Sequence, residues 1–294
     1  MLKVLKVGYV DFETDQLSSL VDYYSGVLGL TSTHRDANSV YLTVALDHHC
    51  VGLKAGAETR LLKYGLQIAP TDLNELESSL KAKGIGARCI TDGEPGIPQL
   101  VQICDPDGIV IDLFIVTQPP GVPYSHQGVQ PHKLAHLALL TPDIQRKLTF
   151  YRDALGFRFS DSIQDFFYFL RCGADHHGVN LLRWDQAGMH HLAFEVSDMS
   201  HLCASTDVLS RSHIPLIWGP TRHGPGHNVS AYHRNPAGQI VELFCEIDRM
   251  SNEDFGYFDP RPWHTEFPQR PKRWEDVEEA ASLWGIMCPP KFLS

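Results

Sequence analysis

The chain repeats itself with a period of about 127 residues, and this repeat constrains the fold more than any other feature of the sequence. Residues 7–30, VGYVDFETDQLSSLVDYYSGVLGL, follow the pattern of residues 134–157, LAHLALLTPDIQRKLTFYRDALGF: a short apolar strand, then an amphipathic helix. Residues 104–114, CDPDGIVIDLF, match residues 234–244, RNPAGQIVELF, as an Asx-Pro turn that leads into an apolar strand. A repeat of this size indicates a fold built by duplication.

Each copy divides further into two βαβββ modules. In the first modules, Asp15 and Asp143 are the predicted N-caps of the helix, and Gly156 is a predicted helix stop. The second modules have their predicted helices at residues 71–86 and 197–215. A sheet with a helix on one face leaves the other face uncovered, so two modules must pair around a shared interior. The predicted fold class is α+β, with two duplicated domains, each of paired βαβββ modules that curve around a central cavity.

Proline and glycine mark the junction between the copies. We predict an N-terminal domain over residues 1–118, a linker over residues 119–131 and a C-terminal domain over residues 132–250. Beyond residue 250 the repeat ends, and residues 251–294 form a tail rich in proline, arginine and tryptophan. A short helix is expected from Glu275 to about Trp284. The tail is predicted to cover the functional site.

Composition argues against several classes of partner. The 294 residues carry a formal net charge of −10 without a basic patch, so neither nucleic acid nor a membrane is an expected partner. The first residues read as a strand rather than a signal peptide, and no apolar run is long enough to cross a bilayer.

The seven cysteines are scattered, odd in number and without a CxxC pair. Reduced thiols and a cytoplasmic location are therefore predicted.

The repeat also shows which of the 16 histidines the fold does not require. His136 and His191 in the second copy correspond to tyrosines in the first, and Glu242 corresponds to Asp112. If these histidines were needed only for structure, both copies would be expected to keep them. The C-terminal copy is therefore predicted to hold a functional set that the N-terminal domain lacks.

Side-chain alternation along three predicted strands directs this set into one interior. In AHLALL, His136 and Ala138 share a face, opposite two leucines that suit packing beneath a helix. By the same reasoning His191 in HHLAFEV and Glu242 in QIVELF point inward. Two imidazoles and one carboxylate suit non-haem Fe(II), with coordination positions left open. The alternative is that the histidines are hydrogen-bonded interior residues and that Glu242 pairs with an arginine.

The sequence resembles the type I extradiol ring-cleaving dioxygenases of the vicinal oxygen chelate superfamily. The resemblance is to the catechol 2,3-dioxygenase and 2,3-dihydroxybiphenyl 1,2-dioxygenase families, and it extends to about residue 250. Its most specific part is residues 219–242, where GPTRH is followed by AY, NPAG and VE. The resemblance implies that His136, His191 and Glu242 hold Fe(II), with Mn(II) as the second choice. It also implies a homo-oligomer.

The resemblance places His177, His223 and Tyr232 around the metal. A catechol must lose at least one proton to chelate a metal through both oxygens, and His223 or Tyr232 is suited to accept or share it. Cleavage of the O–O bond needs a proton donor, and this role falls to His177. The predicted substrate-binding residues are Ala138, Phe169, His223 and Tyr232. The other histidines of the loop motif, His227 and His233, are predicted to be surface or rim residues.

These features predict an enzyme that cleaves the ring of a catechol, or of a substituted or biaryl 2,3-diol, with O2 next to the two hydroxyls, in aromatic degradation. One alternative keeps the fold and the metal but is a glyoxalase-like isomerase or a thiol transferase. Another is a non-catalytic module that binds an aromatic compound or drug. Asp-His-His recurs at residues 47–49, so a structural role for His177 also stays open. Pro225 and Gly226 stand where the biphenyl-diol enzymes have Asn-Asp, which is closer to the catechol type.

Overall fold

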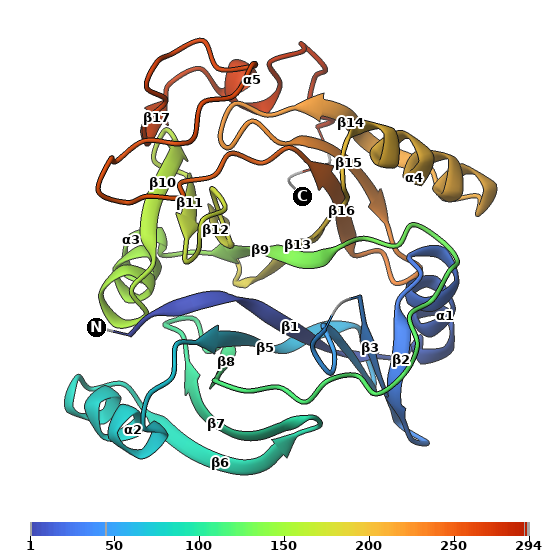
Figure 1. Ribbon diagram of the computed structural model, residues 1–294, viewed down its shortest axis with the longest axis vertical. Coiled ribbons are helices and arrows are strands. Elements are labelled where there is room, and N and C mark those ends of the chain that lie inside the picture. The colour runs from blue at the N-terminus through green and yellow to red at the C-terminus, as the bar shows by residue number, and fades with distance from the viewer. Residues whose placement is uncertain (1, 45, 291, 293–294) are drawn as a thin grey trace. The chain divides into compact units, whose positions relative to one another are not determined.

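The computed structural model describes residues 2–44, 46–290 and 292, and it divides into two compact units (Figure 1). Unit 1 consists of Met1–Leu134 and Asn235–Gly238, and unit 2 consists of Ala135–Arg234 and Gln239–Ser294. Among the described residues, no helix is both long enough and apolar enough to cross a membrane.

Unit 1 contains two βαβββ modules joined in one sheet. The first comprises β1 (Val4–Thr14), α1 (Leu17–Asp22) with its π-helical extension η1 (Tyr23–Val27), β2 (Thr31–Arg35), β3 (Ser39–Thr43) and β4 (Val51–Ala55). The second comprises β5 (Arg60–Ile68), α2 (Leu73–Ala82), β6 (Ala87–Glu94), β7 (Ile97–Cys104) and β8 (Val110–Phe114). The eight strands lie in the order β2-β3-β4-β1-β5-β8-β7-β6.

Unit 2 repeats this plan and adds a strand from the tail. Its first module comprises β9 (Lys133–Thr141), α3 (Ile144–Thr149) with η2 (Phe150–Ala154), β10 (Arg158–Ile163), β11 (Phe167–Arg171) and β12 (Val179–Arg183). Its second comprises β13 (Gly188–Glu195), α4 (Met199–Arg211), β14 (Leu216–Arg222), β15 (Val229–Arg234) and β16 (Ile240–Cys245). With β17 (Lys272–Trp274), the strand order is β14-β15-β16-β13-β9-β12-β11-β10-β17.

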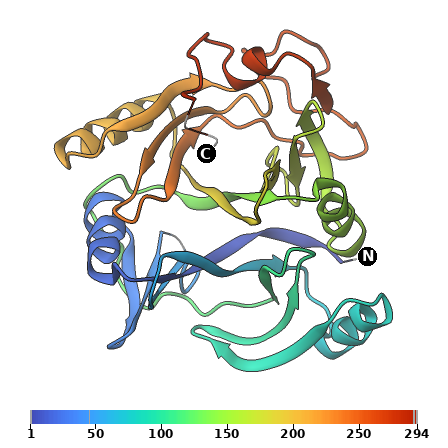
Figure 2. The same ribbon diagram turned by 180° about the vertical axis from the view of Figure 1, so that it is seen from behind.

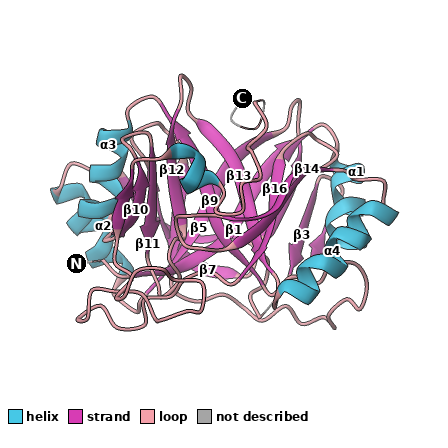
Figure 3. Cartoon of the chain, turned by 90° about the horizontal axis from the view of Figure 1, so that it is seen from above, coloured by secondary structure: helices cyan, strands magenta, loops and turns pink. Residues whose placement is uncertain are grey.

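The α+β fold class predicted from the repeat is confirmed. In each unit the first strands of the two modules are neighbours in the middle of the sheet, which joins the modules edge to edge. The sheet of unit 2 curls around an interior (Figure 2), and helices α3 and α4 lie outside its strands (Figure 3). This curvature follows from the uncovered sheet face, which becomes the wall of a shared interior.

The helix signals in the sequence are partly confirmed. Asp143 caps α3 by accepting a hydrogen bond from Arg146 N at 3.1 Å, and Gly156 ends the helical segment with a φ of 75°. The prediction for Asp15 is wrong, because Gln16 occupies the N-cap position of α1 and makes no side-chain cap. The Asp15 carboxylate instead accepts a hydrogen bond from a threonine hydroxyl.

The segment expected to be a linker, residues 119–131, is attached to unit 1 by hydrogen bonds. Ser125 N donates to Thr31 Oγ1 at 2.8 Å, and Val129 N donates to Val27 O at 2.9 Å. These bonds fix the backbone of the segment against the first module. The boundary between the units accordingly falls after Leu134, beyond the proline-rich stretch.

The C-terminal tail packs on unit 2 rather than extending away from it. Strand β17 runs parallel to β10, and a short helix, α5 (Val277–Ala281), follows with Asp276 as its N-cap. The helix is shorter than the predicted range of 275–284. Ala280 is buried and packs with Trp274 and Phe169, so the tail reaches the interior of the unit.

Candidate active site

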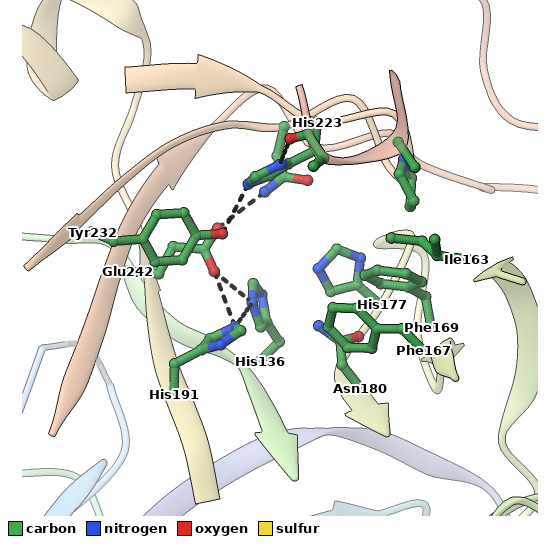
Figure 4. A pocket seen from close by; sticks show the side chains of 14 residues that line it. His136, Ile163, Phe167, Phe169, His177, Asn180, His191, His223, Tyr232 and Glu242 are labelled. Carbon is green, nitrogen blue, oxygen red and sulfur yellow. Dashed lines mark hydrogen bonds and ion pairs between the residues drawn. The ribbon is translucent and has the colours of Figure 1, made fainter. Parts of the chain in front are cut away.

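Three adjacent strands bring the predicted metal ligands together. His136 lies on β9, His191 on β13 and Glu242 on β16, and β13 lies between the other two strands. All three side chains are buried and face one pocket (Figure 4). The alternation expected from the sequence thus corresponds to the observed register, in which Ala193 of β13 pairs with Glu242.

The three ligand atoms converge within hydrogen-bonding distance of one another. His136 Nε2 lies 3.0 Å from Glu242 Oε2, and His191 Nε2 lies 3.2 Å from the same oxygen. The two Nε2 atoms are 3.3 Å apart. Two imidazole nitrogens and one carboxylate oxygen aimed at a common point, with no thiolate among them, fit a divalent metal with open coordination positions.

Hydrogen bonds from β15 and the loop before it hold the Glu242 carboxylate. Ser230 Oγ donates to Glu242 Oε1 at 2.6 Å, and Asn228 Nδ2 donates to the same oxygen at 3.1 Å. The second oxygen is thereby left to face the imidazoles, an arrangement typical of metal sites. The alternative arginine partner for Glu242 is absent among the described residues. Ser230 could have been found from the sequence, because it lies two residues before Tyr232 on the same strand face.

The protonation of Glu242 and His191 also suits metal binding. Burial raises the pKa of the Glu242 carboxyl, but the facing imidazoles outweigh this effect and hold its pKa well below the usual value. Burial lowers the pKa of His191, and the nearby Glu242 only partly offsets this. A carboxylate and a neutral imidazole are the forms that bind a metal ion.

The tail fixes which nitrogen of His191 faces the pocket. His190 Nε2 lies 2.9 Å from the carbonyl oxygen of Phe292, and His190 Nδ1 lies 2.6 Å from His191 Nδ1. A carbonyl only accepts, so His190 donates from Nε2 and its Nδ1 accepts from His191 Nδ1. Burial lowers the pKa of His190 to about 3, which keeps this imidazole neutral. His191 Nε2 is therefore unprotonated and free to bind a metal.

His223 and Tyr232 form a hydrogen-bonded pair on one side of the pocket. His223 Nε2 lies 2.8 Å from Tyr232 Oη, and His223 Nδ1 lies 2.7 Å from the carbonyl oxygen of Ala281 in the tail. His223 must donate from Nδ1 to the carbonyl, so its Nε2 accepts from the tyrosine hydroxyl. Burial lowers the pKa of His223, and burial together with Glu242 raises the pKa of Tyr232 well above its usual value. Both groups are neutral.

His177 lies on the opposite side of the pocket from Tyr232 (Figure 4). Its ring centroid is 4.4 Å from that of His136, and burial lowers its pKa well below the usual value. Its Nδ1 lies 2.9 Å from Nδ1 of His176, whose Nε2 lies 3.3 Å from Asp161 Oδ2. If His176 directs its Nε2 proton to this carboxylate, its Nδ1 accepts from His177, and His177 Nε2 is left as an acceptor.

Asp161, which the sequence did not single out, is held by the tail. Trp274 Nε1 donates to Asp161 Oδ2 at 2.8 Å, and Lys272 N donates to Oδ1 at 2.8 Å. Asp161 has only 1% of its surface exposed. Because its partners come from β17, outside the repeat, no comparison of the two copies could have revealed this contact. In the sequence, only the Asp-His-His motif indicated a role for His176.

The pocket encloses about 370 Å³ of free space, part of it open to solvent. It is lined by His136, Ile163, Phe167, Phe169, His177, Asn180, His191, His223, Pro225, Asn228, Tyr232, Glu242, Ala280 and Ala281. Phe169 thus lies where the sequence placed it, whereas Ala138 does not line the pocket. The side chain of Ala138 is a single methyl group. Asn180, which pairs with Ala138 from the neighbouring strand β12, reaches the pocket instead. Among the residues that the structure describes, none forms a hydrogen bond with Asn180 Oδ1.

The expectation that His227 and His233 lie at the surface is wrong, because both are buried. His227 Nδ1 lies 2.7 Å from Asp248 Oδ2, and His264 Nε2 lies 2.8 Å from Asp248 Oδ1. Each oxygen of this carboxylate already has an imidazole partner. The cluster therefore acts as a hydrogen-bond network that joins the loop after β14 to the tail.

Comparisons with known proteins agree with this geometry. The family model described as Glyoxalase/Bleomycin resistance protein/Dioxygenase superfamily matches residues 133–243, a range that contains the three converging ligands. Metapyrocatechase 2 of Cupriavidus necator is 30% identical over 261 residues, which cover 78% of this chain and 81% of that protein. The chain belongs to the extradiol dioxygenase family of the vicinal oxygen chelate superfamily.

Solved structures show the same fold over the whole length of this extradiol dioxygenase family member. The Mn(II)-bound glyoxalase from Novosphingobium aromaticivorans has a TM-score of 0.86 at 24% identity, and the match covers 100% of this chain and 95% of that one. Homoprotocatechuate 2,3-dioxygenase from Arthrobacter globiformis has a TM-score of 0.85 at 22% identity, with coverage of 99% and 91%. At these identities the structures establish only the fold of this chain. The reaction has to be inferred from the residues of the pocket.

Proposed function

We propose that the protein uses O2 to open the aromatic ring of a catechol at the bond next to the two hydroxyls. The observation that carries this proposal is the meeting of two kinds of group in one pocket. One is the convergent set of two histidines and a glutamate. The other is the set of neutral proton carriers, His177, His223 and Tyr232, on opposite sides of it.

We propose that His136, His191 and Glu242 hold Fe(II), with Mn(II) as the alternative. The donor set suits either ion, because it combines imidazole with carboxylate and has no thiolate. When bound, the metal supplies adjacent coordination positions for the diol oxygens and O2, and a path for electrons between them. The protein supplies the geometry, the proton carriers and the walls of the pocket.

The Tyr232–His223 pair is suited to accept the first proton from the diol. His223 Nε2 is already the acceptor for the tyrosine hydroxyl at 2.8 Å. A diol hydroxyl that donates to Tyr232 Oη can therefore release its proton while the tyrosine passes its own to His223 Nε2. The carbonyl of Ala281 holds His223 in the tautomer that this transfer requires.

His177 is suited to take a proton on the other side and to return it during O–O cleavage. Burial keeps its imidazole neutral, and the contact with His176 occupies Nδ1, so Nε2 is the atom available to the pocket. A group that first accepts and then donates must be neutral before the substrate arrives. His177 meets this condition, because burial keeps it neutral and His176 contacts its Nδ1.

The walls of the pocket suit a flat, single aromatic ring. Phe167 and Phe169 lie with ring centroids 4.5 Å apart, and Ile163 adds an apolar side chain next to Phe169. Asn180 Oδ1 offers a buried acceptor for a polar substituent. The loop also carries Pro225, as in the catechol type of the resemblance. Catechol and methylcatechols are therefore the first substrates to test.

Oxygen uptake on reconstituted protein tests this function. Anaerobic protein would be loaded with Fe(II) or Mn(II) and mixed with aerated catechol, 3-methylcatechol or 2,3-dihydroxybiphenyl. We expect oxygen consumption matched by a yellow ring-opened product. Activity should be lost in His191→Ala and Glu242→Ala and kept in His34→Ala, which removes an exposed histidine. Protein that binds metal but consumes no oxygen with any diol would contradict the proposal.

A glyoxalase-like isomerase is the second candidate, favoured by the fold shared with the Mn(II)-bound glyoxalase. Isomerisation moves a proton within a thiol adduct of an α-ketoaldehyde and consumes no O2. It also has no need for a separate pair such as Tyr232–His223. Turnover of the glutathione adduct of methylglyoxal in the absence of O2 would support the isomerase over the dioxygenase.

We also propose a cytoplasmic location and self-association. All seven cysteines are free thiols, which suits a reducing compartment. The homo-oligomer rests on the family resemblance alone. Light scattering coupled to gel filtration would measure the mass directly, and a single-chain mass of 33.0 kDa would contradict self-association.

A further inference from the structure

Unit 1 contains a second convergence of potential metal ligands, apart from the candidate active site. Asp11 lies on β1, His49 lies in the turn before β4, and Glu94 is the last residue of β6. Their exposed fractions are 0%, 2% and 2%, so all three side chains are buried. The three facing atoms, Asp11 Oδ1, His49 Nε2 and Glu94 Oε1, lie within 4.8 Å of one another.

None of these three facing atoms has a hydrogen-bond partner among the described residues. His49 Nε2 lies 3.3 Å from Glu94 Oε1, without hydrogen-bond geometry, and 4.0 Å from Asp11 Oδ1. A buried polar atom without a partner is unfavourable, so three of them at one point require an explanation. Their arrangement leaves a single position that an ion could share.

The remaining carboxylate oxygens are held by lysines. Lys54 Nζ donates to Asp11 Oδ2 at 3.0 Å, and Lys63 Nζ donates to Glu94 Oε2 at 2.5 Å. Lys63 also donates to Asp112 Oδ2 at 2.6 Å. Each lysine thus fixes one oxygen and turns the other toward His49, as hydrogen-bonding partners of metal ligands commonly do.

The two lysines of this interior leave one negative charge to be neutralised. Three buried carboxylates, Asp11, Glu94 and Asp112, face two lysine ammonium groups. One negative charge is left, and a buried unpaired charge is expensive. A proton on Asp11, whose pKa is raised by burial, would balance it, but His49 Nε2 would still lack a partner. A divalent cation would contact all three facing atoms.

The neighbouring histidine supports a ligand role for His49. His48 Nδ1 lies 3.0 Å from His49 Nδ1, which repeats the contact between His190 and His191 in unit 2. In unit 2 this contact leaves the second histidine with its Nε2 free toward the metal ligands. The same contact in unit 1 would direct the lone pair of His49 Nε2 at two carboxylates. A cation between them would make that arrangement favourable.

We propose that Asp11, His49 and Glu94 form a second divalent-metal site in unit 1, with a preference for Mn²⁺. Two carboxylates and one imidazole are oxygen-rich, which suits Mn²⁺. The site is not a copy of the one in unit 2, because Tyr9, the counterpart of His136, donates to Asp112 at 2.6 Å. Asp11 lies two residues further along the same face of β1. The metal would join β1 and the turn before β4 to β6 of the second module.

Counting bound Mn²⁺ tests the site independently of catalysis. The double variant His191→Ala/Glu242→Ala removes the candidate active-site metal, so any stoichiometric Mn²⁺ that it keeps must bind elsewhere. We expect about two ions per wild-type chain and about one per double-variant chain, by elemental analysis and by the loss of the free Mn²⁺ electron paramagnetic resonance signal. Added Mn²⁺ should also raise the melting temperature of the double variant.

Adding His49→Gln to the double variant should abolish both the binding and the thermal shift. The control His34→Gln removes an exposed histidine of the same unit and should leave both unchanged. A double variant that is folded by circular dichroism but binds no Mn²⁺ would overturn the proposal, whatever His49→Gln does. Mn²⁺ binding that persists unchanged after His49→Gln is added would do the same. Neither result bears on ring cleavage, which depends on the metal in unit 2.

Discussion

In two places in unit 2, neighbouring histidines face each other through their Nδ1 atoms. His191 meets His190 at 2.6 Å, and His177 meets His176 at 2.9 Å. His190 orients His191, and His176 orients His177. His191 and His177 then present Nε2 to the pocket. A ring that binds a metal or accepts a proton must be in one tautomer, and such contacts determine it.

This role of His190 can be tested with two variants at one position. His190→Leu removes the acceptor for His191 Nδ1, so we expect the affinity of the active-site metal to fall about 10–100-fold. His190→Gln keeps an amide that can accept from His191 and donate to Phe292, so its loss should be smaller. Metal titrations of both variants measure this difference. Equal affinities in the two variants would show that the contact does not orient His191.

The Tyr232 hydroxyl provides the second test at this scale. Tyr232→Phe keeps the ring that stacks on Trp218 at 5.3 Å but removes the proton path to His223. We expect kcat to fall about 100-fold or more, with metal content and melting temperature little changed. Steady-state oxygen uptake measures the effect, with Tyr257→Phe, in the tail, as the control. An unchanged kcat would place the proton path elsewhere.

At the scale of elements, the sequence predicted most of what the repeat contains. Periodicity predicted the four modules, and alternation predicted that β9, β13 and β16 direct His136, His191 and Glu242 to one point. Features outside the repeat were not predictable in this way. The carbonyls of Ala281 and Phe292 contact His223 and His190 through the backbone, and a backbone contact leaves no residue type to recognise.

The tail strand β17 should influence catalysis through Asp161. Asp161→Asn weakens the acceptor for Trp274 and removes the negative charge that faces His176 Nε2, so we expect His177 to be held less firmly. We expect kcat to fall about 10–100-fold with a smaller change in KM. The matched control is Asp165→Asn, which breaks an exposed ion pair with Arg273 of the same strand. Equal effects of the two substitutions would point to general loosening of β17 rather than to His177.

At the scale of the whole molecule, buried neutral histidines make stability depend on pH. His233 is fully buried, and burial lowers its pKa to about 3. The unfolded chain takes up a proton at this position below about pH 6.5, whereas the folded chain does not. The stabilisation is therefore complete above that pH and is lost as the pH falls toward the folded pKa. Such burial was not predictable, because His233 lies beside charged and polar residues in the sequence.

We expect His233 to account for about 2 kcal/mol of stability lost between about pH 7.5 and pH 5. In His233→Gln this loss should be absent, so the difference in unfolding free energy between wild type and variant should shrink by that amount. Urea denaturation of the metal-free proteins at both pH values measures it. A difference that stays constant with pH would show that the folded His233 takes up a proton normally.

The converging ligands of unit 2 come from both of its modules. β9 of the first module supplies His136, and β13 and β16 of the second supply His191 and Glu242. One module alone does not supply all three ligands, so the centre requires two modules to pair. In the laboratory, two co-expressed fragments split between β12 and β13 should regain tight metal binding only when they reassociate, so the bound metal would report on their assembly.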